Sequence, residues 1–379
     1  MQTREHPLLS PGLGTERRVT SFHFGPAGGA KVYIQAALHA DELPGMLVAF
    51  TLKARLAELE KQGRLAAEVV LVPAANPIGL DQRLLGHGLG RFELGSGHNF
   101  NRHYPALADA VFDAVADRLG PDASANVALI RAELARQLAA LTPANELESL
   151  RLTLMRLAAD ADLVLDLHCD LDAGVHLYTL TPLWERVEPL ARYLGSCAQL
   201  LALDSGEHPF DEACSQLWHL LDQKSRSRAA GLGEDAPPVP LACCAVTVEL
   251  RGQDSVAHEL AERDAGALIA YLTERGFVAG DAPPPPALPY PATPLAGVDD
   301  LVAPHAGVIV FHRSAGQAVR AGDVVADVID PVAGTATPLV ARRDGMLYAR
   351  VRDRYAAPGL WVAKIATDLA FKTGKLLSA

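Results

Sequence analysis

Two short apolar runs on either side of a helical stretch constrain the fold of this chain most strongly. The runs are residues 32–38, VYIQAAL, and residues 69–75, VVLVPAA, which have the length and composition of buried strands. Between them, residues 45–63 show helical spacing that starts after Pro44 and ends at Gly63. Strand, helix and strand form a βαβ unit, which predicts a mostly parallel sheet covered by helices.

The alternation of strands and helices continues to about residue 275. We expect further strands at 161–167, 175–179 and 241–250, and helices at 106–119, 125–141, 146–159, within 182–201 and at 258–275. Residues 203–240 contain an amphipathic piece followed by a polar, turn-rich stretch, for which we expect a mobile loop. The pattern predicts one large α/β domain over residues 1–279.

A proline-rich stretch separates this domain from a region of a different kind. Residues 280–294, GDAPPPPALPYPATP, can form neither a helix nor an interior strand, so we expect a semi-rigid linker at 280–296. Beyond residue 301, short strand-like runs alternate with turn signals, and two stretches repeat weakly. Residues 297–379 are therefore predicted to form a small all-β domain of two hairpin-like halves.

The composition argues against several kinds of partner and location. The net charge of −11 comes from scattered acids and no basic run is present, which argues against binding to nucleic acid. No stretch approaches the roughly 20 apolar residues that span a bilayer, and the N-terminus lacks the apolar core of a signal peptide. The five cysteines lack C-x-x-C spacing, which argues against a disulfide framework. We expect a soluble, cytoplasmic protein without a membrane partner.

Candidate metal ligands stand directly after two of the predicted strands. His39 and Glu42 are three residues apart, and imidazole nitrogens and carboxylate oxygens are ordinary zinc ligands. His168 follows another strand, and the carboxyl ends of parallel strands meet at one edge of a sheet. Either histidine alone could be a capping or surface residue. Together they predict a catalytic zinc site, which typically has three protein ligands and an open fourth position.

Glu249 closes the predicted strand AVTVEL and is delivered to the same edge. A metal-dependent amidase needs a group that takes a proton from the attacking water and passes it to the leaving nitrogen. Glu249 is the candidate general base, and a salt bridge near Arg251 is the structural alternative. Asp166 lies two residues before His168, so it could orient that imidazole or act as a structural acid.

The irregular stretch at 76–105 is long enough to suggest a functional loop. From this loop, Arg91 and Arg102 could reach the metal edge. One guanidinium would hold a substrate carboxylate through two parallel hydrogen bonds, and the other would polarise the scissile carbonyl. Both arginines could equally tie down the loop. Because three ligands already complete a site, we expect the loop histidines behind the ligands or on the surface: His87, His98 and His103.

These motifs resemble the zinc carboxypeptidase superfamily and, within it, the succinylglutamate desuccinylase/aspartoacylase family. The resemblance spans residues 32–276 and rests on five motifs in the family's order: HADE at 39–42, NP at 76–77, NFNR at 99–102, DLH at 166–168 and TVEL at 247–250. It implies a doubly wound, mostly parallel α/β/α sandwich of the zinc-carboxypeptidase type. It also implies one zinc ion per chain and hydrolysis of a small N-acyl amino acid or a related carboxylate-bearing amide.

The resemblance implies the same three zinc ligands and the same general base. It also implies roles for residues of the irregular stretch at 76–105. Asn101 and Arg102 correspond to the pair that grips the substrate carboxylate, and Arg91 to the carbonyl-polarising arginine, with Arg83 a nearby competitor. The chain departs from the family at Asn99, where an aspartate is usual, so the contact of that residue with a ligand is open.

The C-terminal region resembles the β-sandwich that ends several of these enzymes, and GQAVRAGDVVADVID is similar to biotinyl and lipoyl carrier domains. Carrier domains modify a lysine at a hairpin tip, whereas this chain has no lysine between Leu301 and Ala363. Attachment of biotin or lipoate is therefore not expected. We expect this carrier-like barrel-sandwich to form a wall of the pocket or a contact within a homo-oligomer.

Two rival functions use the same residues. A zinc carboxypeptidase acting on peptides would share the site, although the carrier-like region is more typical of the acylases. A catalytically silent ligand-binding homologue would keep the pocket without hydrolysis, and the presence of Glu249 beside three ligands speaks against it. In each case the expected partner is a small molecule or a short peptide.

Overall fold

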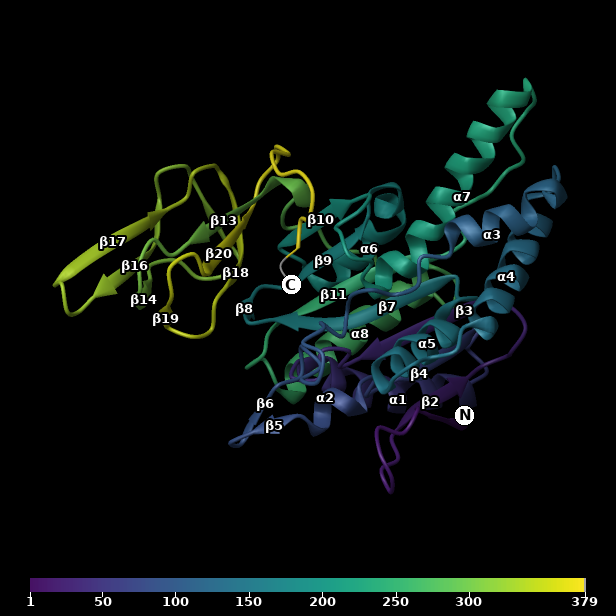
Figure 1. Ribbon diagram of the computed structural model, residues 1–379, viewed down its shortest axis with the longest axis horizontal. Helices are drawn as coiled ribbons and strands as arrows, with labels where there is room; N and C mark the ends of the chain where they lie inside the picture. Colours follow the sequence, from purple (N-terminus) through teal and green to yellow (C-terminus); the bar gives the residue numbers. More distant parts are fainter. Residues whose placement is uncertain (378–379) are drawn as a thin grey trace.

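The protein, described here by a computed structural model that covers residues 1–377, has two regions of different architecture (Figure 1). The larger region contains a nine-stranded sheet with helices on both faces, and the smaller region is all-β. The strands of the large sheet, in spatial order, are β1 (Gln2–Pro7), β2 (Arg18–Phe24), β4 (Glu68–Val72), β3 (Lys31–Ala36), β7 (Leu163–Asp170), β11 (Cys244–Gly252), β9 (His176–Leu180), β10 (Ala198–Ala202) and β12 (Ala292–Pro294).

The four central strands β4, β3, β7 and β11 run parallel, as the βαβ pattern predicts. β9 is antiparallel to β11, and β1 and β2 add an antiparallel edge that the sequence did not suggest. In the register of β7 and β11, Glu249 lies opposite His168. The carboxyl ends of the central strands therefore deliver both residues to one edge of the sheet.

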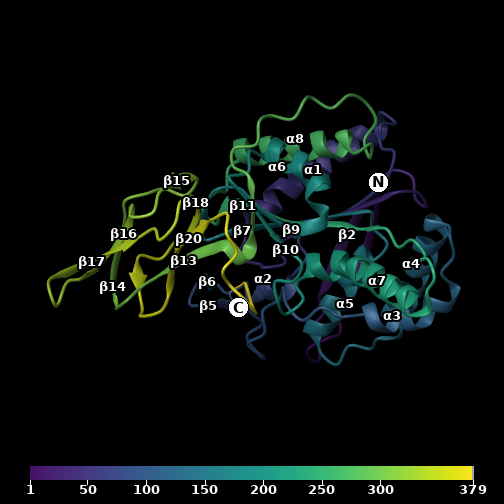
Figure 2. The ribbon, with the colours of Figure 1, turned by 90° about the horizontal axis from the view of Figure 1, so that it is seen from above.

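Helices cover both faces of the sheet, which confirms the predicted α/β/α layers (Figure 2). One face carries α1 (Pro44–Lys61), α6 (Trp184–Leu194) and α8 (His258–Glu274), whose apolar side chains pack into one core cluster. The other carries α3 (Ala108–Val115), α4 (Ala123–Ala140), α5 (Glu146–Ala158) and α7 (Phe210–Leu232). No helix within residues 1–377 has the length and apolar character needed to cross a membrane.

The prediction of a mobile loop in the polar stretch within residues 203–240 is wrong up to Leu232, because α7 continues to that residue. The polar second half of α7 buries only Ser225 and Ala229 and also carries ion pairs on its exposed side. Arg226 pairs with Asp222 one turn earlier, and Arg228 pairs with Asp117 next to α3. Such pairs stabilise a solvated helix that hydrophobic periodicity does not reveal. The helix ends where Gly233 adopts a left-handed conformation.

The C-terminal region consists of two antiparallel sheets, in agreement with the predicted all-β sandwich. One contains β13 (Val298–Val302), β20 (Trp361–Ala366), β18 (Gly345–Arg350) and β15 (Gln317–Val319), and the other β17 (Thr335–Val340), β16 (Val324–Asp330), β14 (Gly307–Phe311) and β19 (Tyr355–Ala356). β18 also pairs with the short strand β8 (Asp172–Ala173), which directly follows β7. This pairing fixes the C-terminal region beside the edge of the large sheet where the candidate ligands lie.

Candidate functional site

The loop between β3 and α1 carries the first two candidate ligands. The chain leaves β3 through Ala37, whose φ of 58° lies in the left-handed region that few non-glycine residues adopt. The backbone N–H of Glu42 then donates to the carbonyl of His39 over 3.1 Å, which forms a tight turn. The turn directs both side chains toward β7, where His168 lies.

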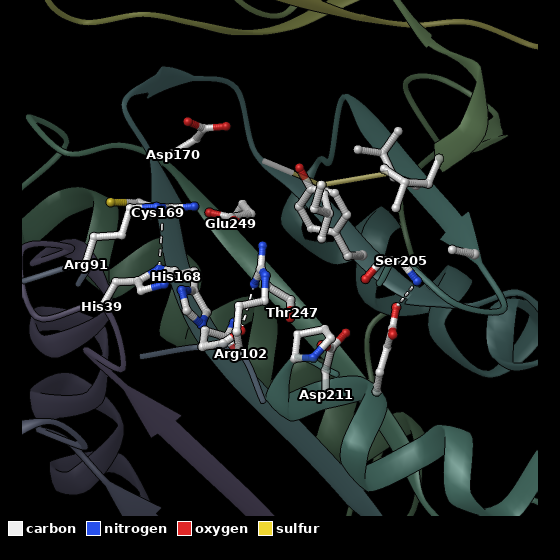
Figure 3. Close-up of a pocket in the computed structure, with 18 of the residues that line it drawn as sticks. His39, Arg91, Arg102, His168, Cys169, Asp170, Ser205, Asp211, Thr247 and Glu249 are labelled. Carbon is white, nitrogen blue, oxygen red and sulfur yellow. Dashed lines mark hydrogen bonds between the residues drawn. The ribbon is translucent and has the colours of Figure 1, made fainter. Parts of the chain in front are cut away.

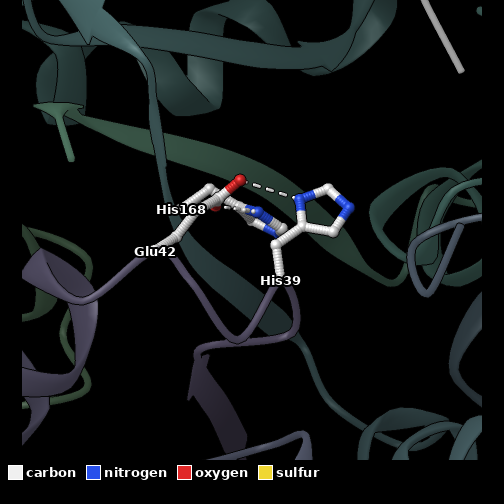
Figure 4. A group of neighbouring side chains, drawn as sticks. All are labelled: His39, Glu42 and His168. Atoms are coloured by element: carbon white, nitrogen blue, oxygen red, sulfur yellow. Dashed lines mark hydrogen bonds and ion pairs between the residues drawn. The ribbon is translucent and has the colours of Figure 1, made fainter. Parts of the chain in front are cut away.

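His39, Glu42 and His168 form one buried group, and one donor atom from each lies within 4.8 Å of the others (Figure 4). Glu42 stands between the two imidazoles. Its Oε1 lies 2.8 Å from Nδ1 of His39 and its Oε2 lies 2.8 Å from Nδ1 of His168. Burial disfavours the charged carboxylate, but the two histidines outweigh burial and lower the pKa of Glu42.

Each histidine is also contacted on its other ring nitrogen. Nε2 of His39 lies 2.8 Å from Oδ1 of Asn99, and Nε2 of His168 lies 2.9 Å from Oδ2 of Asp166. The hydrogen bond with Asn99 fixes the proton of His39 on Nε2 and leaves Nδ1 able to bind a metal, whereas Nε2 of His168 and Oδ2 of Asp166 lie at ion-pair distance without hydrogen-bond geometry. Asp166 itself accepts a hydrogen bond from Gln35 on the neighbouring strand β3. Asp166 lies beside His168, where it could orient that imidazole. Asn99 contacts His39 from the position at which the family usually has an aspartate.

The nitrogen and oxygen atoms that His39, Glu42 and His168 offer suit a divalent metal ion of intermediate softness. Two imidazole nitrogens and one carboxylate oxygen match the ligands of catalytic zinc sites, and each imidazole has an oxygen acceptor behind it. His39, Glu42 and His168 could therefore hold one metal ion. The three exposed loop histidines lie outside this group: His87, His98 and His103.

Glu249 faces the same pocket from β11 and is partly buried. Burial and the nearby charge of Glu42 raise its pKa to about 8. Within residues 1–377, Oε2 of Glu249 has no hydrogen-bond partner. Arg251, the structural alternative partner, pairs instead with Asp264 over 2.7 Å. Glu249 thus lines the same pocket as His39 and His168, and among the described residues nothing binds its Oε2.

Arg91 reaches the ligand group from the loop that follows α2 (Pro77–Asp81). Its Nη1 lies 3.4 Å from Oε1 of Glu42. The preceding residue, Gly90, accepts a hydrogen bond from the backbone N–H of Ala40 over 2.9 Å, which ties the two loops together. Arg83, the competing arginine, is exposed on the small hairpin of β5 (Arg83–Leu84) and β6 (His87–Gly88). The structure thus places Arg91 at the site and Arg83 outside it.

Asn101 and Arg102 line the pocket from the same loop, and both are buried. The side-chain oxygen of Asn101 accepts a hydrogen bond from the backbone N–H of Phe210, at the first residue of α7. Nε of Arg102 lies 3.7 Å from a carboxylate oxygen of Glu207. Asn101 therefore holds the start of α7, while the guanidinium of Arg102 lies among the residues that line the cavity.

The pocket is a cavity of about 270 Å³ that both regions of the protein line (Figure 3). Trp361 and Lys364 of β20 form part of its wall, which supports the expectation of a pocket wall for the C-terminal region. Nζ of Lys364 lies 3.6 Å from Asp170, at the end of β7. Burial opposes ionisation of Asp170, but Lys364 and His176 outweigh it and lower the pKa of Asp170.

Sequence reasoning missed a set of polar residues at the other end of the pocket. Asp211 and Glu212 occupy the first turn of α7, and Ser205 lies in the loop before it. The sequence indicates only an amphipathic piece somewhere within residues 203–240, which does not single out these acids. The signal that could have found them is Pro209 followed by two acids, because acidic residues are enriched in the first turn of a helix.

Comparison with known proteins identifies relatives of the whole architecture. The catalytic domain of the succinylglutamate desuccinylase/aspartoacylase family matches residues 28–275. A crystal structure of a family protein from Shewanella amazonensis has a TM-score of 0.82 at 27% identity, and covers 97% of this chain and 99% of its own. One from Shewanella frigidimarina has a TM-score of 0.82 at 25% identity, and covers 97% of each chain.

A more distant relative shares the fold. The product-bound ectoine utilization protein of Ruegeria pomeroyi has a TM-score of 0.66 at 16% identity, and covers 96% of this chain and 94% of its own. No curated protein matches the chain. The comparisons support both the family and the fold that the sequence motifs predict.

Proposed function

This chain belongs to the succinylglutamate desuccinylase/aspartoacylase family, and from that premise we propose that it is a zinc-dependent hydrolase that cleaves the amide bond of a small N-acyl amino acid. One observation carries the proposal. Glu249, whose Oε2 has no hydrogen-bond partner within residues 1–377, lies in the same pocket as the buried group of His39, Glu42 and His168. A metal site beside an unused carboxyl group is the minimum that metal-assisted amide hydrolysis needs.

His39, Glu42 and His168 would hold one zinc ion per chain. When bound, zinc would act as a Lewis acid on the amide carbonyl and lower the pKa of a water molecule in the site. The contacts of Asn99 and Asp166 with the imidazoles keep the ligand nitrogens oriented toward the metal position.

Glu249 acts as the general base and then the general acid. Its carboxylate takes a proton from the attacking water, and the same group later gives a proton to the departing amine. Because burial and Glu42 raise its pKa to about 8 in the metal-free protein, the carboxyl group binds a proton near neutral pH. A cation bound nearby would favour the carboxylate form of Glu249 and so lower its pKa. Glu249 could then accept a proton from water and later give it up to the amine.

Arg91 and Arg102 position the substrate. The guanidinium of Arg91, close to Glu42, donates to the carbonyl oxygen on which negative charge develops. Arg102 binds the substrate carboxylate, and Asn101 assists by fixing the loop and the start of α7 in place. A carboxylate-bearing small molecule fits a cavity of about 270 Å³ better than a folded protein does. We place the enzyme in the cytoplasm.

The test combines metal content with activity. We expect one zinc per chain in the purified protein and hydrolysis of at least one member of a panel of acetyl and succinyl amino acids. His168→Ala should lose both zinc and turnover, whereas the exposed loop variant His98→Ala should keep both. Hydrolysis of peptides in preference to acyl amino acids would support the carboxypeptidase alternative, and zinc binding without any hydrolysis would support a silent binding protein.

A further inference from the structure

The end of the pocket away from the metal ligands holds the buried side chains of Glu212 and Ser205, and the Ser205 hydroxyl lies close enough to the Glu212 carboxyl group to oppose the rise in its pKa. Glu212 and Ser205 are 7% and 2% exposed, and both line the cavity. Oε1 of Glu212 accepts a hydrogen bond from the backbone N–H of Ser205 over 2.8 Å. Within residues 1–377, neither Oε2 of Glu212 nor Oγ of Ser205 has a hydrogen-bond partner. Leaving such atoms unsatisfied in the interior of a protein is unfavourable, so they are expected to bind a ligand.

The position of these atoms separates them from the reacting centre. Figure 3 shows Ser205 and Asp211 on the far side of Arg102 and Thr247 from His39 and His168. A substrate whose carboxylate meets Arg102 can therefore extend past it toward Ser205. The C-terminal segment holds this end in place, because the backbone N–H of Leu376 donates to the carbonyl of Ser205 over 3.0 Å.

The charges at this end favour a cation. Glu212 is flanked by Asp211 and Asp204, and burial together with the charge of Asp211 raises the pKa of Glu212 to about 8. Arg102 and Lys375, the nearby cations, both lie within ion-pair distance of Glu207. A substrate carboxylate at this end would further disfavour ionisation of Glu212, whereas a substrate ammonium would favour its ionised form and offset the repulsion from the neighbouring acids.

We propose that Glu212 and Ser205 form a subsite for a primary ammonium group of the substrate, so that the preferred substrate is an N-acyl amino acid whose side chain ends in an amine. The three donors of an ammonium group match the free carboxylate oxygen and the free hydroxyl oxygen. This inference rests on the proposed function and extends it, because it selects basic over acidic acyl amino acids.

Glu212 could instead serve only to stabilise α7, because acidic residues in the first turn of a helix interact favourably with the helix dipole. The test therefore separates substrate recognition from helix stability. The substrates are the N-acetyl derivatives of ornithine, glutamine, glutamate and alanine, measured on the zinc-loaded full chain. The variants are Glu212→Gln, Ser205→Ala and, as a matched control, Glu259→Gln. Glu259 is an exposed first-turn glutamate of α8 that lies outside the pocket.

We expect kcat/KM for N-acetylornithine to exceed that for N-acetylglutamine by about tenfold or more, with N-acetylglutamate the poorest substrate. Glu212→Gln should bring the ornithine-to-glutamine ratio to about one, and Ser205→Ala should lower it about threefold. Glu259→Gln should leave the ratio unchanged. A wild-type ratio of one or below, or an equal loss for all four substrates in Glu212→Gln, would overturn the subsite.

A second measurement keeps this inference apart from the proposed function. If the zinc-loaded protein hydrolyses neither these four substrates nor any other member of the acetyl and succinyl panel, the proposed function fails, and calorimetry with L-ornithine then tests the subsite alone. Binding of ornithine but not of glutamate, lost in Glu212→Gln, would support it. Absence of ornithine binding, which would mean that the two oxygens bind only water, would overturn it.

Discussion

Nε2 of His39 lies 2.8 Å from the side-chain oxygen of Asn99, and the contact leaves Nδ1 of the same ring facing Glu42. The same oxygen accepts the backbone N–H of Asn101 over 2.8 Å. One amide side chain therefore orients a candidate metal ligand and the loop that carries Arg102. Arg151 of α5 donates to the backbone carbonyl of Asn99 over 2.9 Å and holds it in place.

Removal of this amide should weaken metal binding without removing a ligand. For Asn99→Ala we expect a loss of about 10–100-fold in zinc affinity, because the imidazole of His39 loses the acceptor that fixes its tautomer. Asn99→Asp keeps an acceptor and should bind zinc at least as tightly as the wild type. Competition titration against a chelator measures both. Equal affinities for Asn99→Ala and the wild type would show that the contact does not orient the ligand.

Glu249→Gln should keep zinc and lose turnover. The amide has nearly the shape of the carboxyl group but cannot accept a proton, so we expect kcat to fall by about 10²–10⁴-fold. Zinc content should stay at one per chain because Glu249 is not among the three candidate ligands. Steady-state kinetics and metal analysis on one preparation test both statements. A variant with wild-type kcat would remove Glu249 from the chemistry.

Metal removal should lower the stability of the folded protein. Zinc at about 1,000 times its Kd adds roughly 4 kcal/mol to the free energy of unfolding, because it binds the native state and not the unfolded chain. We therefore expect chelation to lower the Tm of the wild type and added zinc to restore it. His39→Ala should show a Tm that responds to neither treatment. A wild-type Tm that ignores the chelator would contradict a metal site at this position.

The ligand set could be predicted from the sequence because its members follow buried apolar strands. Strand ends are visible in a sequence, and parallel strands bring their carboxyl ends to one edge, so His39, His168 and Glu249 could be placed together before the structure was known. A contact of Asn99 behind a ligand could be suggested only by the family motif NFNR and not by periodicity, since Asn99 lies 60 residues from His39 in an irregular loop.

The opposite end of the pocket could not be predicted for a different reason. Glu212 lines that end and Lys364 lines another part of the pocket, from elements that are far apart in the chain, and nothing in local hydrophobicity brings α7 and β20 together. The edge strands β1 and β2 were missed for a related reason. β1 is mostly polar and exposed, and such a strand lacks the apolar alternation by which strands are recognised.

The acid at the far end of the pocket should make stability depend on pH. The pKa of Glu212 is about 8 in the folded protein against 4.5 as its ordinary value, so the unfolded chain holds fewer protons between these values. The free energy of unfolding should therefore fall as pH rises through this window, by at most about 1.4 kcal/mol per pH unit. Below the window both states are protonated and the effect vanishes.

Glu212→Gln should remove this fall. We expect the variant to gain stability relative to the wild type as pH rises from about 5 to 8, because a neutral amide has no ionisation to lose. Urea unfolding at a series of pH values measures the difference, with Glu259→Gln as the exposed control. A stability gain that accompanies the loss of ornithine preference would be typical of a binding residue kept at a cost to the fold. A constant difference across the pH range would contradict the raised pKa.

The contact between the two loops at the site gives the last prediction. A Cβ atom added at Gly90 would lie 2.2 Å from the backbone nitrogen of Asp41, which is too close for any relaxed structure. Gly90→Ala must therefore push the Arg91 loop away from the turn that carries His39 and Glu42. We expect a lower Tm and a loss of zinc affinity, together with a drop in kcat/KM. Gly88→Ala in the same loop has no atom within 4 Å of its added Cβ and should behave as the wild type. If the two alanine variants bind zinc equally well, the position of the Arg91 loop has no influence on the metal ligands.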